Sequence, residues 1–231
     1  MAPPNLELLR ETANLVRPLL PELVFVGGYT TALLITDEGA ADVRTSYDVD
    51  AIAEITSYSD YIVFSERLKQ LGFTEDSSEE APVCRWRRKQ VILDVMPLDE
   101  KILGFSNRWY KPAMDFAQEH ELQAGLRVRA VTAVYFCATK LEAFAGRGKR
   151  DYLSSHDLED LIAVVDGRSV LIDEIEQAPS DVRSYVSSEV RKLLRISAFM
   201  DALPGYLLPD AASQGRLVNL IASLERIASS M

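Results

Sequence analysis

The feature that most constrains the fold of this chain is an apolar run that ends in two glycines and leads directly into a helix-forming stretch. The run reads LVFVGG at residues 23–28, and YTTALLI follows at residues 29–35. A short apolar run bounded by glycines is typical of a buried strand, and glycine lets the backbone turn sharply into the next element. The stretch therefore predicts a strand, a tight turn and a helix, a unit found in folds that combine a sheet with covering helices.

The hydrophobic pattern of the chain changes near residue 126, where helical periodicity replaces strand-like alternation. Strands are expected at 46–55, 81–88, 90–98 and 126–131, and helices at 5–19, 58–71, 132–146, 156–167, 181–203 and 213–229. The tight join at Lys89–Gln90 predicts an antiparallel hairpin. We therefore expect an α/β (α+β) domain at 1–125 and a mostly helical domain at 126–231.

Composition limits the class of protein and its partners. The 231 residues are 48% hydrophobic, which is enough to bury a substantial core. They include 25 basic and 35 acidic residues, and the formal net charge of −10 argues against broad, non-specific adhesion to nucleic acid. Two cysteines favour a reducing compartment. Because no signal peptide or membrane-length apolar run is recognisable, we expect a cytoplasmic protein without a membrane partner.

Two aspartates stand one residue apart in the predicted strand at 46–55. Alternation places Tyr47, Val49 and Ala51 on one side of that strand, and Asp48 and Asp50 on the other. Carboxylates gathered in this way suit Mg²⁺, a hard cation that prefers oxygen ligands. Chance alone supplies about five acidic pairs at this spacing in so acidic a chain, so the pair needs support from elsewhere.

Asp94 supplies that support, because it interrupts VILDVMP, a very hydrophobic predicted strand. A lone buried carboxylate is costly unless it is paired or binds a metal. Three aspartates on strands form the ligand set that two-metal phosphoryl and nucleotidyl transfer requires. The alternative is that an arginine of the same hairpin, Arg85, Arg87 or Arg88, pairs with Asp94.

Two further features suit phosphate binding. Gly27 and Gly28 would let the backbone approach a phosphate, although a tight strand-to-helix turn explains them equally well. Lys140 lies on a largely apolar helix, with Arg147 two turns later on the same side. A lysine there would bind the β- and γ-phosphates of a nucleoside triphosphate, and the alternative is a lysine that reaches solvent from the helix surface.

Two acids share one face at the start of the predicted helix at 156–167. Asp157 and Asp160 are three residues apart, and Ser155 is placed to cap that helix. The helix dipole is a sufficient structural reason for Asp157, and less so for Asp160.

The order of these motifs resembles the polymerase-β-like nucleotidyltransferase superfamily, and within it the AbiEii-type (type IV toxin) nucleotidyltransferases. The resemblance covers about residues 23–165. It rests on the glycine pair, an R-x-S-x-D-x-D segment from Arg44 to Asp50, a third carboxylate and a lysine helix followed by arginine and an RD…DL segment.

The resemblance implies a mixed nucleotidyltransferase sheet with flanking helices, and a helical half that contributes to the active site. It implies Mg²⁺ as the cofactor and an NTP as a substrate. The implied catalytic residues are Asp48, Asp50, Asp94, Lys140, Asp157 and Asp160, with the first three as metal ligands. The implied nucleotide-binding residues are Gly27, Gly28, Arg44, Ser46, Lys140 and Arg147.

The same resemblance implies a toxin-like role, an RNA acceptor such as a tRNA end, and an antitoxin protein as partner. Two alternatives remain at this point: a nucleotidyltransferase that modifies a small molecule, and a non-catalytic binding module that keeps the fold. CRWRRK at residues 84–89 would contact nucleic-acid phosphate, with Trp86 stacking on a base, or its basic residues are simply solvated by alternation in a hairpin strand. For His120 and His156, capping or solvated roles are favoured over metal binding.

Overall fold

The computed structural model describes residues 4–40, 43–148 and 150–230, and the chain forms two compact units. Unit 1 contains the described residues up to Leu33 and those from Thr45 to Thr132. Unit 2 contains those from Leu34 to Arg44 and from Ala133 onward. Unit 1 thus extends past residue 125. The short described segment from Leu34 to Arg44, which separates its two parts in sequence, belongs to unit 2.

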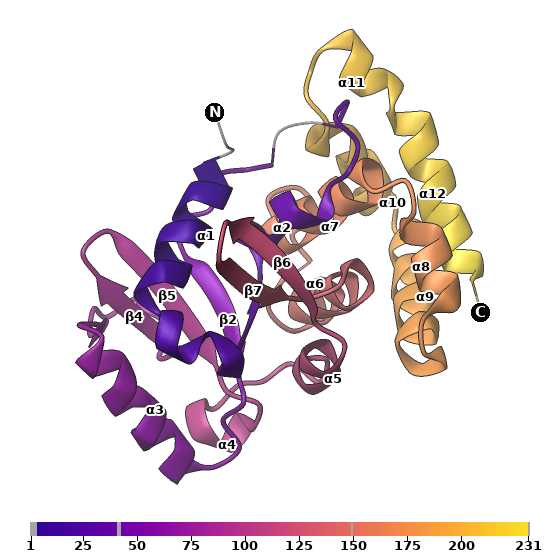
Figure 1. The fold of residues 1–231 in the computed structure, drawn as a ribbon. Coiled ribbons are helices and arrows are strands. Elements are labelled where there is room, and N and C mark those ends of the chain that lie inside the picture. The colour runs from indigo at the N-terminus through magenta and orange to yellow at the C-terminus, as the bar shows by residue number, and fades with distance from the viewer. Residues whose placement is uncertain (1–3, 41–42, 149, 231) are drawn as a thin grey trace. The chain divides into compact units, whose positions relative to one another are not determined.

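Unit 1 is built on a mixed sheet of seven strands (Figure 1). The sheet order is β3-β4-β5-β2-β1-β7-β6, with β1–β7 and β2–β5 parallel and the other neighbours antiparallel. The strands are β1 (Leu23–Val26), β2 (Val49–Ala53), β3 (Thr74–Glu75), β4 (Arg85–Arg88), β5 (Val91–Met96), β6 (Gln118–Gln123) and β7 (Leu126–Ala130). This sheet with its flanking helices confirms the predicted fold class.

Helices cover the sheet of unit 1, and α1 packs across β2, β5, β6 and β7 (Figure 1). They are α1 (Pro4–Leu15), the 3-10 helix η1 (Arg17–Glu22), α2 (Gly28–Leu34), α3 (Tyr58–Gln70), α4 (Glu100–Leu103) and α5 (Tyr110–Asp115). The Ser57 side chain caps α3 by accepting from the Asp60 N–H, and Gly72 ends its C-terminal turn in the left-handed region.

Alternation along the central strands separates an apolar face from a polar one. Val49, Ala51 and Ala53 of β2 are fully buried in the same core as residues of α1 and α3. Asp50 points to the opposite face, because successive side chains of a strand alternate. The prediction for Tyr47 is wrong: its side chain is 78% exposed, because β2 begins only at Val49 and alternation does not extend before it.

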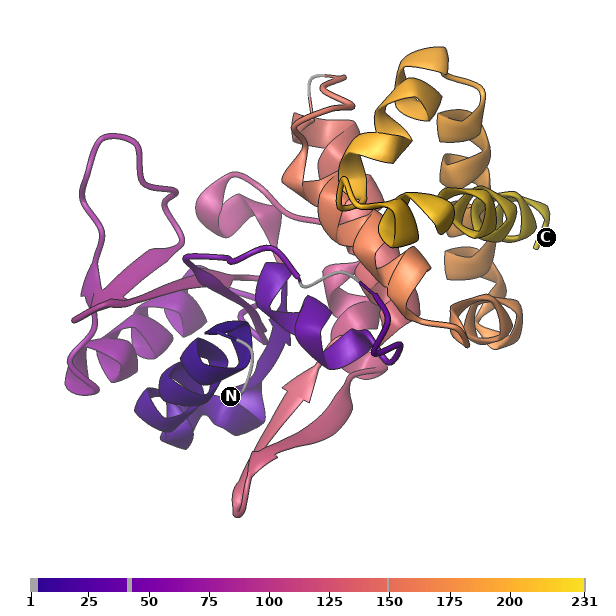
Figure 2. The same ribbon diagram turned by 90° about the horizontal axis from the view of Figure 1, so that it is seen from above.

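Strand β6 was not predicted, because its sequence QEHELQ lacks the apolar alternation of a half-buried strand. It pairs with β7 through the turn at Gly125, and its side chains are exposed or half-buried. Figure 2 shows this hairpin extending from the sheet. Pairing with β7 in an antiparallel ladder, not burial, therefore defines β6.

Unit 2 consists of helices, several of them shorter than the periodicity suggested. They are α6 (Ala133–Arg147), α7 (His156–Gly167), α8 (Leu171–Gln177), α9 (Ser180–Leu194), α10 (Ser197–Ala202), η2 (Leu203–Tyr206), α11 (Ala211–Gly215) and α12 (Leu217–Ser229). The single helix expected at 181–203 is broken at Ile196, whose backbone is extended. The turn there leads to Phe199, which is fully buried.

The described residues of 34–44 belong to unit 2, where Thr36, Asp37 and Arg44 are hydrogen-bonded. The Thr36 and Asp37 N–H groups both donate to the Gly167 carbonyl, at 2.9 and 3.0 Å. Arg216 donates to the carboxylates of Asp37 and Asp166, at 2.7 and 2.8 Å. The contacts of Thr36 and Asp37 join segments more than a hundred residues apart in sequence, so local periodicity could not predict them.

Candidate active site

Three charged residues of unit 1 form a row across adjacent strands on the polar face of the sheet. Strand register pairs Asp50 of β2 with Asp94 of β5, and Asp94 with Arg85 of β4. Neighbouring strands lie about 4.8 Å apart, so residues in register share a face. The sheet therefore brings two of the predicted metal ligands side by side.

Arg85 joins the row to Asp48, which lies directly before β2. Its Nε donates to Asp94 Oδ1 at 2.8 Å, and its Nη2 donates to Asp94 Oδ2 at 2.7 Å. The same Nη2 donates to Asp48 Oδ2 at 2.5 Å. Two carboxylates thus meet at one cationic nitrogen. The alternative that an arginine of the hairpin pairs with Asp94 holds in this structure, and the same arginine also binds Asp48.

Burial shifts the pKa of the Asp94 carboxyl. Loss of hydration raises the pKa of its carboxyl above 3.8, although the hydrogen bonds and charge of Arg85 act in the opposite direction. The ion pair with Arg85 is the reason a carboxylate is tolerated on this strand. Arg85, and not solvent, therefore stabilises the charge of the Asp94 carboxylate.

The carboxylates have the chemistry that Mg²⁺ requires, but they do not form a ready cage. Carboxylate oxygens are the preferred ligands of this cation, and Asp48 and Asp94 already converge on a single positive charge. Within the part of the chain that the structure describes, no three His, Cys, Asp or Glu side chains gather as a metal site. Arg85 occupies the position between two of the three predicted ligands.

Gly27 lies against Asp50 and has two reasons to be glycine. Its φ is +76°, in the left-handed region that disfavours other residues. A Cβ added at this position would overlap the Asp50 carboxylate. Register places Val26 opposite Asp50, so the turn after β1 passes directly beside that side chain. Gly27 thus allows the tight turn and leaves room for the side chain of Asp50, a predicted metal ligand.

Ser46 is buried and held close to this turn through its backbone. The Tyr29 hydroxyl, in the first turn of α2, donates to the Ser46 carbonyl at 2.6 Å. The Ser46 N–H donates to Asn5 Oδ1 at 3.3 Å. These contacts connect the start of α2 to the segment that carries Asp48. Gly27, Gly28, Ser46 and the three aspartates all belong to unit 1.

The remaining predicted site residues form a charged network inside unit 2. Lys140 is only 8% exposed, and its Nζ donates to Asp160 Oδ2 at 2.6 Å and to Asp157 Oδ1 at 3.3 Å. Arg44 donates to both oxygens of Asp160, at 2.8 and 3.0 Å. Lys140 therefore does not reach solvent from a helix surface, and the carboxylates it contacts are those of α7.

Arg147 completes the network at its exposed end. Its Nε and Nη2 donate to the two oxygens of Asp157 at 3.0 and 2.9 Å. Burial alone would raise the pKa of Asp157, but the hydrogen bonds from Arg147 and the charge of Lys140 outweigh it and lower that pKa. Ser155 caps α7 as expected, with its side chain accepting from Leu158 N–H. Asp157 and Asp160 are thus both neutralised within their own unit.

The other sequence candidates have structural roles. Trp86 is 1% exposed and lies in the core of unit 1, so it does not present its ring to a base. Arg87 of the same run pairs with Asp76 at 2.5 Å. His156 is exposed beside Glu159, and His120 lies on the edge strand β6.

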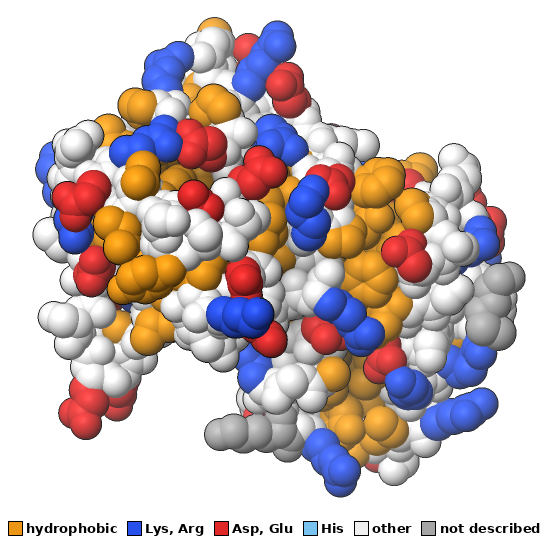
Figure 3. Space-filling view, turned by 90° about the horizontal axis from the view of Figure 1, so that it is seen from below, with side chains coloured by type: hydrophobic (Ala, Val, Ile, Leu, Met, Phe, Trp, Pro, Cys, Tyr) orange, Lys and Arg blue, Asp and Glu red, His pale blue; other side chains and the backbone are white. Residues whose placement is uncertain are grey.

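Surface charge is mixed on the face drawn in Figure 3, where basic and acidic side chains alternate and do not gather into one basic area. Within the described residues, no helix is both long and apolar enough to cross a membrane.

Comparison with known proteins supplies the name of the fold. No protein-family model matches the sequence, and no curated protein matches it. Among solved structures, a nucleotidyltransferase-like protein from Paracoccidioides brasiliensis superposes with a TM-score of 0.51, at 18% identity over 85% of this chain and 93% of its own. The chain has a nucleotidyltransferase-like fold. At this identity the likeness concerns the fold, and catalysis has to be argued from the site.

Two proteins from Helicobacter pylori are also similar. A candidate nucleotidyltransferase has a TM-score of 0.46, at 12% identity over 99% of this chain and 96% of its own. JHP933 has a TM-score of 0.47, at 14% identity over 96% of this chain and 92% of its own. None of the three likenesses identifies an AbiEii-type protein.

Proposed function

We propose that this protein is a Mg²⁺-dependent nucleotidyltransferase that moves a nucleoside monophosphate from an NTP to an acceptor hydroxyl. The observation that carries the proposal is the convergence of Asp48 and Asp94 on one cationic nitrogen, with Asp50 in register beside Asp94. A structural ion pair needs one carboxylate for one arginine. Here three aspartates share one part of a nucleotidyltransferase-like sheet, which is the ligand set for this reaction.

In the proposed reaction the acceptor oxygen bonds to the α-phosphorus, the bond from that phosphorus to the β-bridging oxygen breaks, and pyrophosphate leaves. Asp48, Asp50 and Asp94 would hold Mg²⁺, which supplies charge neutralisation for the triphosphate. The Asp94 carboxylate also receives the proton of the acceptor hydroxyl. Gly27, Gly28 and Ser46 line the turn proposed to receive the triphosphate.

Arg85 has a defined part in this proposal. Its guanidinium holds Asp48 and Asp94 together and keeps the buried carboxylate charge compensated. Arg85 must give up at least one of these carboxylates before a metal ion takes its place.

The acceptor and the biological setting are proposed from the family resemblance. They are an RNA end such as that of a tRNA, a toxin-like role, and an antitoxin protein as partner. A small-molecule acceptor is the second candidate, favoured by the net charge of −10, since an acidic protein gains little from non-specific attraction to RNA.

The test is transfer of label from each of the four NTPs, in Mg²⁺, to a total RNA pool. Wild-type protein should label RNA with one or more NTPs, and Asp48→Asn and Asp94→Asn should abolish the label. Asp76→Asn is the matched control, because it alters another aspartate–arginine pair on the same sheet, to Arg87. Equal labelling by the wild type and the Asp94→Asn variant would contradict the proposal. NTP turnover without RNA labelling would favour the small-molecule acceptor, and no NTP binding in Mg²⁺ would favour a non-catalytic module.

A further inference from the structure

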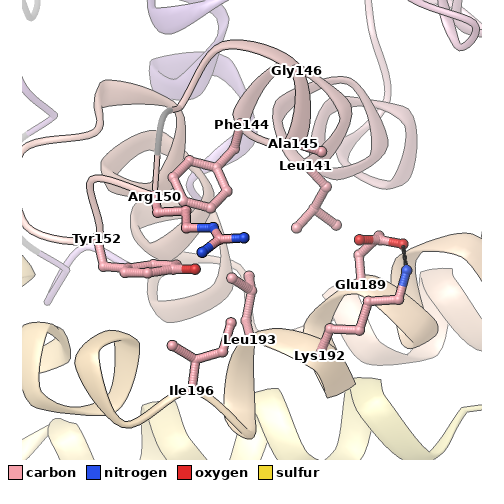
Figure 4. A pocket seen from close by; sticks show the side chains of 10 residues that line it. All are labelled: Leu141, Phe144, Ala145, Gly146, Arg150, Tyr152, Glu189, Lys192, Leu193 and Ile196. Atoms are coloured by element: carbon pink, nitrogen blue, oxygen red, sulfur yellow. Dashed lines mark hydrogen bonds and ion pairs between the residues drawn. The ribbon is translucent and has the colours of Figure 1, made fainter.

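Unit 2 contains a pocket that none of the predicted site residues lines. Its volume is about 390 Å³, which is within the range of small-molecule sites. The side chains that line it come from α6, the segment after it, α9 and the residues that follow α9 (Figure 4). They are Leu141, Phe144, Ala145, Gly146, Arg150, Tyr152, Glu189, Lys192, Leu193 and Ile196.

Leucine side chains form one side of the pocket, and contacts of Tyr152 with its neighbours fix the position of another. Leu141 and Leu193 are almost fully buried. The Tyr152 ring packs against Phe144 and Phe199, with ring centroids 5.5 and 6.5 Å apart. A hydrogen bond of 2.6 Å from the Tyr206 hydroxyl to the Tyr152 carbonyl holds the backbone of that residue. The pocket is therefore bounded by side chains that are already in place, which reduces the entropy lost on binding.

Arg150 is exposed at the edge of this space, and its guanidinium points into it between the side chains of Phe144, Tyr152 and Leu193 (Figure 4). Lys140, Arg147 and Arg44 of the same unit each form an ion pair. No ion pair among the described residues includes Arg150. Its backbone has a φ of +61°, a conformation that costs energy in a non-glycine residue. A guanidinium held over apolar side chains is suited to a carboxylate, which its planar fork binds through two hydrogen bonds.

The approach of Arg150 depends on the glycine at the end of α6. A Cβ at Gly148 would overlap the Phe144 side chain, so only glycine lets the chain run this close to that ring. The Gly148 N–H donates to the Phe144 carbonyl at 2.9 Å, and the Asp151 N–H donates to the Gly148 carbonyl at 2.8 Å. This turn sets Arg150 beside the pocket.

The charge balance of the lining indicates one negative charge on the ligand. Lys192 and Glu189 neutralise each other through an ion pair of 2.5 Å at the rim. Among the lining residues, Arg150 then contributes one further positive charge. We propose that the pocket binds a small organic carboxylate, with its carboxylate on Arg150 and its apolar body on Leu141 and Leu193. This site is independent of the proposed nucleotidyl transfer.

The experiment uses the full chain and 3-phenylpropionate as the probe, observed by saturation-transfer NMR and titrated by calorimetry. Saturable binding in the millimolar range or tighter is expected. Acetate, which lacks the apolar body, and 3-phenylpropanol, which lacks the charge, should each bind about tenfold more weakly or less. Equal binding of acetate would mean that a surface cation attracts any anion, and would overturn the proposal. So would the absence of saturable binding.

Three variants localise the site. Arg150→Gln should weaken binding about tenfold, and Arg226→Gln, an exposed arginine of α12 outside the pocket, should leave it unchanged. Arg150→Gly, which removes the charge and relaxes the backbone, replaces Arg150→Gln if that variant does not fold. Unchanged binding in either Arg150 variant would overturn the proposal.

Discussion

Lys140 is surrounded by charge in a way that a helical pattern does not reveal. Two carboxylates of α7 accept its hydrogen bonds, and the same carboxylates bind Arg44 and Arg147. Removing one partner from a buried ion network leaves other charges poorly compensated and costs more than losing an exposed pair. This network therefore stabilises unit 2 whatever part Lys140 has in catalysis.

Lys140→Met should destabilise the protein by about 2 kcal/mol, because methionine keeps the length of the side chain but donates to neither Asp157 nor Asp160. Urea unfolding followed by circular dichroism measures the loss. Arg147→Met is the control: the Arg147 side chain is 74% exposed, and its removal should cost less, below about 1 kcal/mol. Wild-type stability of the Lys140 variant would contradict the buried network.

Asp157 should give the protein part of its resistance to acid. Its pKa in the folded chain is below the ordinary value of 3.8, so the unfolded chain binds the proton more readily. The contribution of Asp157 is then complete above about pH 4 and is lost as the pH falls through the lowered pKa.

The Asp157→Asn variant should accordingly show a flatter fall in unfolding free energy than the wild type from about pH 5 downward. Urea midpoints over that range, with the exposed Glu225→Gln as control, measure the two slopes. Parallel slopes for wild type and Asp157→Asn would show that the folded structure does not perturb this carboxyl.

At the scale of elements, the turn between β1 and α2 joins a backbone requirement to the position of a candidate metal ligand. Gly27 adopts a positive φ, and its missing side chain leaves room for the Asp50 carboxylate. Gly125, in the β6–β7 turn, has a φ of +74° but would meet nothing within 4 Å if it carried a Cβ. The two glycines share a left-handed backbone that other residues disfavour, and they differ in what lies beside them.

Gly125→Ala should cost about 1 kcal/mol, the penalty of a left-handed backbone in a residue with a Cβ. Gly27→Ala should cost roughly 3 kcal/mol or more, since it adds an overlap with Asp50 to the same penalty. It should also lower transfer by displacing that carboxylate. Equal losses of stability in the two variants would mean that the approach of Asp50 to Gly27 carries no energetic weight.

At the scale of the whole molecule, the proposed function makes Mg²⁺ and an NTP binding partners of the folded chain. A ligand that binds only the folded state raises the melting temperature by mass action. Because the metal and the triphosphate would share the site of Asp48, Asp50 and Asp94, the two together should raise the melting temperature by more than the sum of their separate effects. Asp94→Asn should remove this excess, and Asp76→Asn should retain it. Strictly additive shifts in the wild type would contradict a shared site.

The sequence alone was sufficient for the central strands and for the face on which Asp50 lies. Alternation is a local property, so Val49, Ala51 and Asp50 could be assigned to opposite faces without knowledge of the rest of the chain. The same holds for the hairpin at Lys89–Gln90 and for the cap at Ser155. The mixed sheet with its flanking helices followed from the family resemblance, and the structure confirms it. The hydrophobic pattern is weak at the polar strand β6 and near Ile196, so the sequence predicted neither that strand nor the break in the helix.

Only the tertiary structure decided which charge meets which. The sequence offered three arginines as partners of Asp94. Strand register selected Arg85, and the same nitrogen of Arg85 also binds Asp48. Lys140 is buried because α7 packs against α6. Thr36 and Asp37 belong to unit 2, where Gly167 and Arg216 bind them. Each of these outcomes depends on contacts between segments distant in sequence, and their free energies arise only when packing excludes water and fixes both partners.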